Sequence, residues 1–170
     1  MNILLVVDMQ NDFINGTLGT REAENIVESV IKKIKSYEKE NVYATMDTHG
    51  TNYLDTAEGK KLLVKHCIEN TDGWKIHKEI KNLIDEKNIF IKQIFGSVDF
   101  VEKVKSLKEV KKIEIVGLCT DICVIVNAIL LKTYFPEIEI IVDSKCVAGT
   151  TIEKNREAIS VMKSCQIDII

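Results

Sequence analysis

Short apolar runs, separated by stretches of helical periodicity, constrain the fold of this chain more than any other feature of its sequence. The first run, NILLVVD, is uninterrupted, as expected for a central strand that is buried on both faces of a sheet. From Arg21 to Glu40 the apolar residues return at helical spacing, with charged residues between them. A strand followed by an amphipathic helix is the repeating unit of α/β proteins with a parallel sheet.

The same alternation continues to the end of the chain. We expect further strands at NVYATMD, NIFIKQI, KKIEIVGL, PEIEIIVDS and QIDII. Further helices are expected over residues 74–86, 98–107, 121–134 and 151–164. This order predicts an α/β fold of three layers with a mostly parallel, Rossmann-like sheet and right-handed crossovers. With 170 residues, one proline and no low-complexity stretch, we expect a single domain over residues 1–170.

Composition and charge argue against several classes of function. A net charge of −3 gives no reason to expect a nucleic acid or an anionic membrane as partner. No segment approaches the roughly 20 apolar residues of a membrane span, and the start, MNILLVVDMQNDF, lacks the flank and cleavage site of a signal peptide. Five cysteines, an odd number, fit reduced thiols better than a disulfide framework. We therefore expect a cytoplasmic protein whose partner is a small molecule.

Three reactive residues lie at the ends of expected strands. Asp8 ends the first run, Lys92 lies in IFIKQIF, and Cys123 lies in GLCTDICV. The carboxyl ends of parallel strands share one edge of the sheet, where open α/β sheets bind their ligands. A thiol, a carboxylate and an ammonium that converge there would form a nucleophilic site.

The position of Cys123 suits a nucleophile. Thr120 or Asp121 can cap the helix that follows KKIEIVGL, which places Cys123 in its first turn. A helix N-terminus stabilises a thiolate and offers backbone N–H groups to a developing oxyanion. The alternative is that Cys119 and Cys123 are small core residues, as most free cysteines are. A redox or metal role is less favoured, because their spacing matches neither a thioredoxin-like pair nor a zinc knuckle.

Asp8 and Lys92 also have simpler interpretations. Asp8 can merely cap the loop that follows its strand. Lys92 can be the charged residue of an edge strand, which prevents edge-to-edge association. Against this, a lysine within an apolar strand needs a partner or a route to water, since an unpaired buried charge is costly.

A second group of polar residues follows the second strand: Asp47, His49, Glu58 and His66. Side chains repeat every second residue in an extended segment, so Asp47 and His49 lie on the same side. Oxygen and imidazole donors together suit zinc, iron or manganese. The alternative is that these loop histidines simply face water.

Taken together, these motifs resemble the isochorismatase-like cysteine hydrolases, and among them the nicotinamidase branch. The matching motifs are VVDMQNDF, Asp-x-His after the second strand, HC followed by NTDG, a lysine ending the third strand, and G-x-x-T-D-x-C-V. The resemblance covers essentially the whole chain. It implies a six-stranded parallel sheet in strand order 3-2-1-4-5-6 with flanking helices.

By this resemblance Asp8, Lys92 and Cys123 form a catalytic triad. Asp8 takes the thiol proton of Cys123, and Lys92 holds the ion pair and biases the pKa values of both toward the charged forms. The thiolate attacks an amide carbonyl, ammonia leaves, and water hydrolyses the thioester.

The resemblance also implies the residues around the triad. The backbone N–H groups of Cys119 and Cys123 hold the oxyanion, and a cis peptide bond precedes the first of them, at Leu118–Cys119. Phe13 matches the aromatic residue that packs on the substrate ring.

For the cofactor, the resemblance implies one divalent metal ion, zinc in the first place and iron or manganese otherwise, held by Asp47, His49, Glu58 and His66. Many family members supply a further histidine, but the stretch GTNYLDT contains none, so Glu58 takes that place with Asp55 as the alternative. Thr48 stands where a tryptophan is common in the family.

The sequence therefore predicts a metal-assisted nicotinamidase, which converts nicotinamide and water to nicotinate and ammonia. The alternatives are a related hydrolase of another amide or ureido compound, and a non-catalytic or thiol-redox protein on the same fold. Isochorismatase itself is disfavoured, because that branch lacks the nucleophilic cysteine. We also expect a homo-oligomer.

Overall fold

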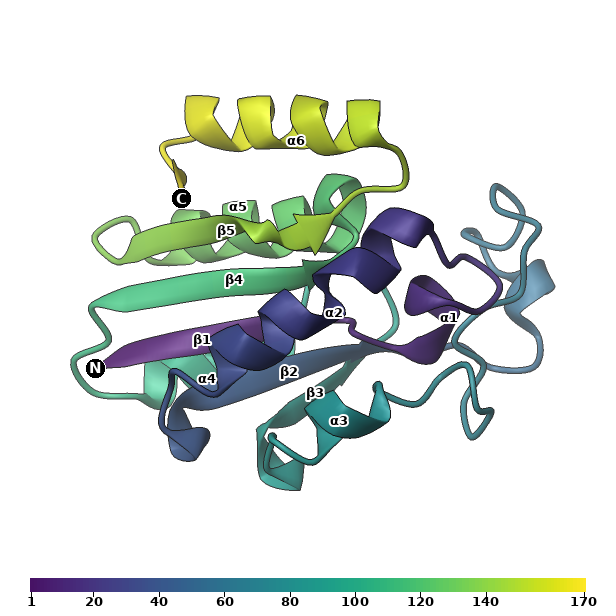
Figure 1. The fold of residues 1–170 in the computed structure, drawn as a ribbon, viewed down its shortest axis with the longest axis horizontal. Helices are drawn as coiled ribbons and strands as arrows, with labels where there is room; N and C mark the ends of the chain where they lie inside the picture. Colours follow the sequence, from purple (N-terminus) through teal and green to yellow (C-terminus); the bar gives the residue numbers. More distant parts are fainter.

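A six-stranded parallel sheet forms the middle layer of the structure, a computed structural model that describes all 170 residues (Figure 1). The strand order is β3-β2-β1-β4-β5-β6, and every neighbouring pair is parallel. The predicted fold class and strand order are confirmed. The strands are β1 Asn2–Val7, β2 Val42–Asp47, β3 Ile89–Lys92, β4 Lys112–Leu118, β5 Glu139–Ala148 and β6 Asp168–Ile169.

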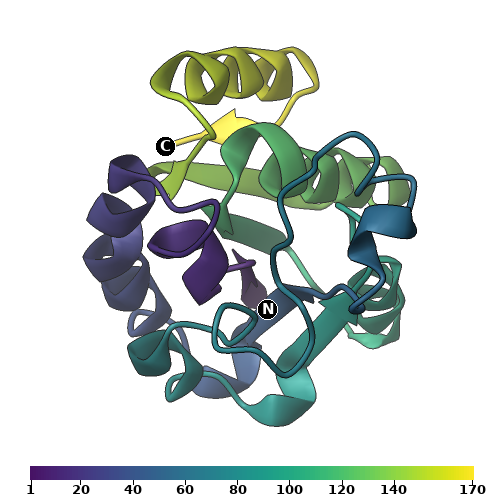
Figure 2. The same ribbon diagram turned by 90° about the vertical axis from the view of Figure 1, so that its right-hand side faces the viewer.

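Helices cover both faces of this sheet. Figure 2 looks onto the carboxyl ends of the strands and shows α2 and α5 on opposite faces. The helices are α1 Asn11–Ile14, α2 Arg21–Ile34, α3 Lys78–Lys81, α4 Val98–Ser106, α5 Ile125–Tyr134 and α6 Ile152–Ser164. Shorter turns are η1 Lys39–Asn41, η2 Tyr53–Asp55, η3 Glu86–Asn88 and η4 Thr120–Val124. None of the helices has both the length and the apolar character that a membrane crossing requires.

Strand β1 shows why its sequence is uninterruptedly apolar. Leu4 and Val6 face a core beneath α2, whereas Leu5 and Val7 face a second core beneath α4 and α5. All four are essentially inaccessible to solvent. A central strand that contributes to two cores has no face on which a polar residue could lie.

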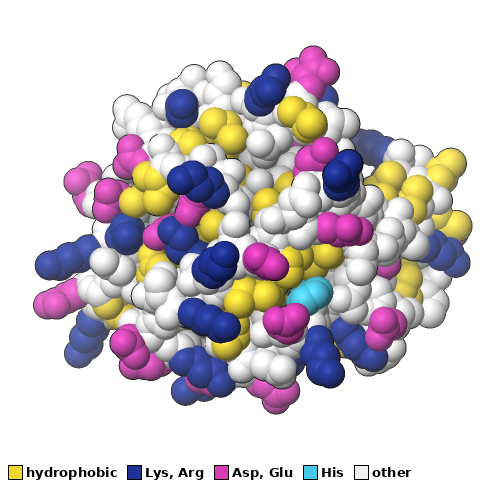
Figure 3. Space-filling model, viewed as in Figure 1, with side chains coloured by type: hydrophobic (Ala, Val, Ile, Leu, Met, Phe, Trp, Pro, Cys, Tyr) yellow, Lys and Arg dark blue, Asp and Glu magenta, His cyan; other side chains and the backbone are white.

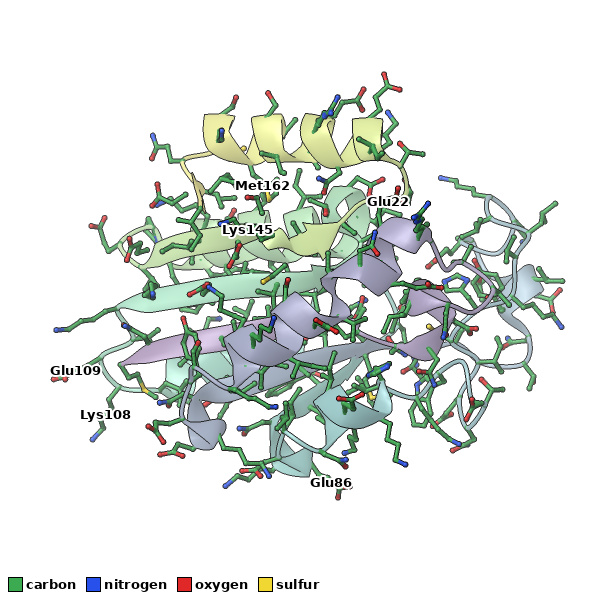
Figure 4. All side chains as sticks on the ribbon, in the orientation of Figure 1. Glu22, Glu86, Lys108, Glu109, Lys145 and Met162 are labelled. Carbon is green, nitrogen blue, oxygen red and sulfur yellow. The ribbon has the colours of Figure 1, made fainter.

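Single residues also fix the packing of α6 on the sheet and the close approach of β4 to β1. Figure 4 shows Met162 on the side of α6 that faces the sheet, where it is fully buried in the second core. Gly117 in β4 has a φ of +117°, and a Cβ atom there would collide with the carbonyl oxygen of Val7. Only glycine fits this position.

The helix predicted over residues 74–86 is wrong in extent, because only Lys78–Lys81 is helical. The backbone before it is bound to the segment after β1 instead. The carbonyl of Trp74 accepts a hydrogen bond from the Gln10 side chain at 2.8 Å, and Ile76 pairs with Gln10 in an antiparallel bridge. A residue whose backbone pairs in this way cannot join a helix, although Ile76 is buried as expected.

A polar cluster lies beneath α2, on the face shown in Figure 3, where acidic and basic side chains are otherwise interspersed. Lys33 of α2 lies 2.5 Å from Glu114 of β4 and 2.8 Å from Asp143 of β5. Tyr37 donates to Glu114 at 2.6 Å, and α2 ends at Ile34 rather than at the expected Glu40. Burial raises the pKa of Glu114, but the bonds from Lys33 and Tyr37 outweigh it and lower that pKa.

We expect Lys33→Met to lower the free energy of unfolding by about 3 kcal/mol, because it removes the cation shared by the buried carboxylates of Glu114 and Asp143. Lys112, 3.6 Å from Glu114, remains but does not replace both contacts. Urea denaturation at neutral pH measures the loss. The matched control is Lys32→Met on the exposed side of α2, which should change stability by less than about 0.5 kcal/mol.

The effect of Lys33→Met has a defined pH dependence. The folded-state pKa values of Glu114 and Asp143 lie below their ordinary values of 4.5 and 3.8. Their stabilising contribution is therefore present above these ordinary values and is lost as the pH falls through the lowered ones. The unfolding free energies of Lys33→Met and wild type should converge in acid, and a gap that widens there would contradict this assignment.

Candidate active site

The strand register brings the reactive residues to one edge of the sheet. Asp47 and Lys92 are partners at the ends of β2 and β3, while Val7 and Gly117 are partners near the ends of β1 and β4. The strand order reverses between β1 and β4, and open α/β sheets bind their ligands at such a point. Figure 2 faces this edge.

Asp8 follows β1 with a φ of +45°, a conformation that aspartate tolerates better than most residues. Its carboxylate is completely buried. The Thr45 hydroxyl donates to Oδ1 at 2.7 Å, and the Lys92 ammonium lies 2.7 Å from Oδ2. The carboxylate is thus bound by the neighbouring strands, so it does not cap the loop.

Lys92 ends β3, which is an edge strand of the sheet. Nevertheless its side chain is buried, whereas the preceding Ile91 is half exposed. The Lys92 Nζ lies 2.7 Å from Asp8 Oδ2, 3.5 Å from Asp47 Oδ1 and 3.4 Å from Cys123 Sγ. The interpretation of Lys92 as a solvent-facing edge charge is therefore excluded.

Cys123 lies in η4, a π-helical turn that leads directly into α5. The expected cap by Thr120 or Asp121 is wrong, because Cys119 occupies the N-cap position and makes no side-chain cap bond. The Asp121 carboxylate instead accepts from the N–H and the hydroxyl of Thr150, at 2.8 and 2.6 Å. It thereby ties η4 to the loop before α6.

The turn between β4 and η4 has the backbone that the resemblance implies. The peptide bond Leu118–Cys119 is cis. The Cys119 carbonyl accepts from the N–H groups of Ile122 and Val124, but the Cys119 N–H donates to no backbone acceptor. This N–H group is available to a ligand beside Cys123.

Burial controls the protonation of the site. It raises the pKa of Cys123 well above its ordinary value and raises the pKa of Asp8, and the Lys92 ammonium opposes both shifts. Burial also disfavours the charged form of Lys92, but Asp8, Cys123 and Asp47 outweigh it and raise the pKa of Lys92. Lys92 is consequently a buried positive charge that favours the charged forms of both Asp8 and Cys123.

The second group of polar residues also converges. One donor atom each of Asp47, His49 and His66 lies within 4.8 Å of the others, and all three residues are buried. The Asp47 Oδ2 lies 2.9 Å from His49 Nε2 and 3.4 Å from His66 Nε2. Burial raises the pKa of Asp47. The hydrogen bonds to His49 and His66 and the charge of Lys92 outweigh burial, so the pKa is lowered overall and this carboxylate stays ionised.

Glu58 completes the cluster, and Asp55 does not. The Glu58 Oε1 lies 3.8 Å from His49 Nε2 and 3.7 Å from His66 Nε2, whereas Asp55 is exposed in η2. The second Glu58 oxygen is buried without a hydrogen-bond partner. His66 Nδ1 lies 2.9 Å from the Val64 carbonyl, which orients Nε2 toward the carboxylates. Two imidazoles and two carboxylates arranged in this way fit a divalent cation.

Two residues that hold the site together were not predicted from the sequence. Thr45, which binds Asp8, lies two positions before Asp47, so the period of a strand could have indicated it. Gln10 is completely buried and holds the backbone of Asp47, donating to its carbonyl and accepting from its N–H at 2.8 Å each. Its only signal was its place in VVDMQNDF.

Tyr53 is a third residue that the sequence did not indicate. It is fully buried, with its ring centroid 4.7 Å from that of His49 and 5.0 Å from that of His66. Burial, together with the charges of Glu58 and Asp47, raises the pKa of Tyr53 to about 12. Its hydroxyl therefore stays protonated beside the carboxylates.

A cavity of about 730 Å³ opens onto both groups of residues. Its lining includes Cys119 and Cys123 together with Asp47, Glu58 and His66 of the second group. Its apolar walls include Phe13, Leu18, Leu62, Ile94, Phe95 and Ile122. The cavity thus joins a buried thiol, a candidate cation site and an apolar enclosure of the size of a small organic ligand.

The structure also locates Phe13 and Thr48, the two remaining residues that the family resemblance singled out. Phe13 is buried and its ring lies 5.5 Å from that of His66. Thr48, which replaces the tryptophan, accepts a hydrogen bond from the Trp74 indole N–H at 2.7 Å. Trp74, which follows the Asn70–Gly73 turn, thereby packs beside the Asp-x-His segment.

Comparison with known proteins agrees with this geometry. The family model of the isochorismatase domain matches residues 2–170. The chain is 26% identical to a pyrazinamidase of Pyrococcus horikoshii solved in complex with zinc, with a TM-score of 0.83 over 99% of this chain and 98% of that one. No match was found among curated protein sequences.

Two further solved structures share the fold at lower identity. A nicotinamidase from Bacillus subtilis is 22% identical, with a TM-score of 0.83 over 99% of this chain and 98% of that chain. A pyrazinamidase/nicotinamidase from Streptococcus mutans is also 22% identical, with a TM-score of 0.83 over the full length of both chains.

Proposed function

The chain belongs to the isochorismatase family, and from this premise we propose that it is a cysteine amidohydrolase of small molecules, specifically a nicotinamidase. The observation that carries the proposal is the position of the buried Lys92 ammonium, 2.7 Å from Asp8 and 3.4 Å from Cys123. Cys123 in turn lines the cavity. Burying an ion pair costs desolvation energy, and a thiol that only fills space in the core does not require one beside it. The solved nicotinamidases and pyrazinamidases named above support the same assignment.

The first half of the reaction forms a thioester. Asp8 accepts the thiol proton of Cys123, and Lys92 stabilises the thiolate that results. The raised pKa of Asp8 suits this role, because proton transfer is efficient when base and acid are close in pKa. The sulfur attacks the amide carbon, and the N–H groups of Cys119 and Cys123 stabilise the oxyanion.

Loss of ammonia completes the first half, and hydrolysis of the thioester then returns the site to its starting state. Asp8 gives its proton to the departing nitrogen, which leaves as ammonia. Asp8 then takes a proton from water, whose oxygen attacks the thioester. The C–S bond breaks, Asp8 returns the proton to the Cys123 sulfur and the carboxylate product leaves, so that one water is consumed for each amide.

The residues that would hold a divalent ion are Asp47, His49, Glu58 and His66, with zinc as the first candidate because the Pyrococcus horikoshii structure is a zinc complex. When bound, the ion supplies a Lewis acid that can orient a ring nitrogen of the substrate. Phe13 lines the same cavity and offers an aromatic face to that ring.

Ammonia release across a panel of amides, with and without a chelator, tests the proposed function. The panel includes nicotinamide, pyrazinamide, benzamide and a ureido compound. We expect nicotinamide and pyrazinamide to have the highest kcat/KM and benzamide, which has no ring nitrogen, to be much poorer. A preference for the ureido compound would favour a sister hydrolase of the family. No hydrolysis of any amide would favour a non-catalytic protein.

We expect His49→Ala to lower zinc affinity by about 100-fold or more, since even second-sphere changes cost 10- to 100-fold. Competition with a chromophoric chelator measures the affinity. The variant should also raise KM for nicotinamide, while the rate of Cys123 alkylation by iodoacetamide stays near that of wild type. The matched control is His77→Ala, which removes the one histidine outside the cluster. Equal zinc affinity in the two variants would contradict the assigned ligands.

A further inference from the structure

We propose that Cys119 is a resolving thiol, which forms a reversible disulfide with Cys123 when hydrogen peroxide or a related hydroperoxide enters the cavity. The proposal rests on Cys123 as the reactive thiol of the proposed function. It adds a role for the Cys119 side chain, of which catalysis uses only the backbone N–H.

The two thiols share one surface. Both Cys119 and Cys123 line the 730 Å³ cavity, so both side chains are reached from the same space. They are separated by a single turn, because the N–H of Val124 bonds to the carbonyl of Cys119 at 3.0 Å. Cys119 is the N-cap residue of η4 and Cys123 lies within that turn, so one turn of backbone joins them. Disulfides link residues whose Cα atoms lie close together, at about 4.4–6.8 Å.

No other thiol of the chain competes for this role. Cys67 and Cys146 are buried in the core beneath α2, and Cys165 is exposed at the end of α6. None of the three lines the cavity. Cys119 is only half-buried, and therefore has the access that a second thiol needs.

The surroundings favour oxidation at Cys123 first. Its sulfur lies 3.4 Å from the Lys92 ammonium, which stabilises the thiolate that attacks a peroxide. Burial and then the carboxylates of Asp121 and Asp8 raise the pKa of Cys119, and Lys92 opposes them with a smaller effect. This asymmetry is that of an attacking and a resolving cysteine.

The chemistry balances with peroxide as the only oxidant. The Cys123 thiolate attacks one peroxide oxygen, the O–O bond breaks, and a sulfenic acid and one water form after proton uptake. The Cys119 sulfur then attacks the Cys123 sulfur, the S–O bond breaks, and a second water leaves with the Cys119 proton. Two thiols and one peroxide thus give one disulfide and two waters.

The consequence is a protected enzyme. The disulfide contains no nucleophile, so amide hydrolysis stops. It also prevents further oxidation of Cys123 to sulfinic and sulfonic acids, which thiols do not reverse. Dithiothreitol would restore both thiols.

Peptide mass spectrometry tests the proposal directly. Cleavage after Lys112 and Lys132 gives one peptide, residues 113–132, that holds Cys119 and Cys123 and no other cysteine. After mild peroxide treatment of the wild-type protein we expect this peptide to lose the mass of two hydrogens and to regain it with dithiothreitol. Nicotinamide hydrolysis should fall and recover in parallel.

Two substitutions distinguish a resolving role of Cys119 from a general sensitivity of Cys123 to peroxide. In Cys119→Ala and Cys119→Ser we expect peroxide to add two or three oxygens to Cys123, with activity that dithiothreitol does not restore. Each variant is compared with its own activity before oxidation. Cys165→Ala, the matched control, should behave as wild type.

The possible outcomes distinguish this proposal from the proposed function. Recovery of both Cys119 variants, or sulfinic acid without disulfide in wild type, would overturn the proposal while leaving amide hydrolysis intact. A disulfide that forms in a protein without amidase activity would support the thiol pair and overturn the proposed function.

Discussion

Cys123→Ala should reduce amide hydrolysis by roughly 10⁶-fold, the loss that removal of a nucleophile causes in other hydrolases. The change deletes one sulfur from a buried position and leaves Asp8, Lys92 and the proposed cation ligands in place. Stopped assays of ammonia release, with enzyme in excess to extend the range, measure the effect. Zinc affinity and the circular dichroism spectrum should match those of wild type.

The matched control for this experiment is Cys146→Ala, which deletes a sulfur of equal size from a core position outside the cavity. It should retain activity within a few-fold. Substantial turnover in Cys123→Ala, or equal losses in the two variants, would exclude the thioester mechanism. An equal loss in Cys119→Ala would instead favour a mechanism that needs both thiols.

Lys92→Met should lower kcat/KM by about 10²- to 10⁴-fold, the range of a missing acid–base partner. Without the ammonium, the main group that opposes the effect of burial on Cys123 and Asp8 is lost, so the pKa values of both rise further. Less thiolate is present at neutral pH, and the alkylation of Cys123 by iodoacetamide should slow. Its pH profile should move to higher pH.

The rate of alkylation separates this electrostatic role from a structural one. Lys32→Met, on the surface of α2, should leave the alkylation profile where it is in wild type. An unchanged profile in a folded Lys92→Met protein would contradict the role of Lys92 in activating the thiol, even if hydrolysis were lost.

The fold could be predicted because its signals are local. In an uninterrupted apolar strand such as β1 and an amphipathic helix such as α2, the pattern of apolar residues itself indicates which side chains are buried. The helix over residues 74–86 failed for the opposite reason. Whether Trp74–Ile76 is helical depends on Gln10, a residue more than 60 positions away, and periodicity cannot indicate such a partner.

The candidate site could be predicted only in part. Asp8, Lys92 and Cys123 follow from strand ends, and the structure brings them together. The capping by Thr120 or Asp121 was wrong because Asp121 binds Thr150, which no local pattern reveals. The strand period places Thr45 on the same face as Asp47, so Thr45 could have been indicated, whereas Tyr53 lies in an ordinary loop context and only the folded arrangement shows what it contacts. The cytoplasmic location and the homo-oligomer stay predictions.

The central claim is that Cys123 becomes covalently acylated by a small amide, and rapid-quench mass spectrometry tests it most directly. Enzyme is mixed with excess nicotinamide, quenched in acid within milliseconds, and analysed as intact protein and as the peptide of residues 113–132. We predict a nicotinoyl group on Cys123 that appears before free nicotinate and is absent in Cys123→Ala. Nicotinate release with no adduct at any time, while Cys123→Ala remains active, would contradict the account.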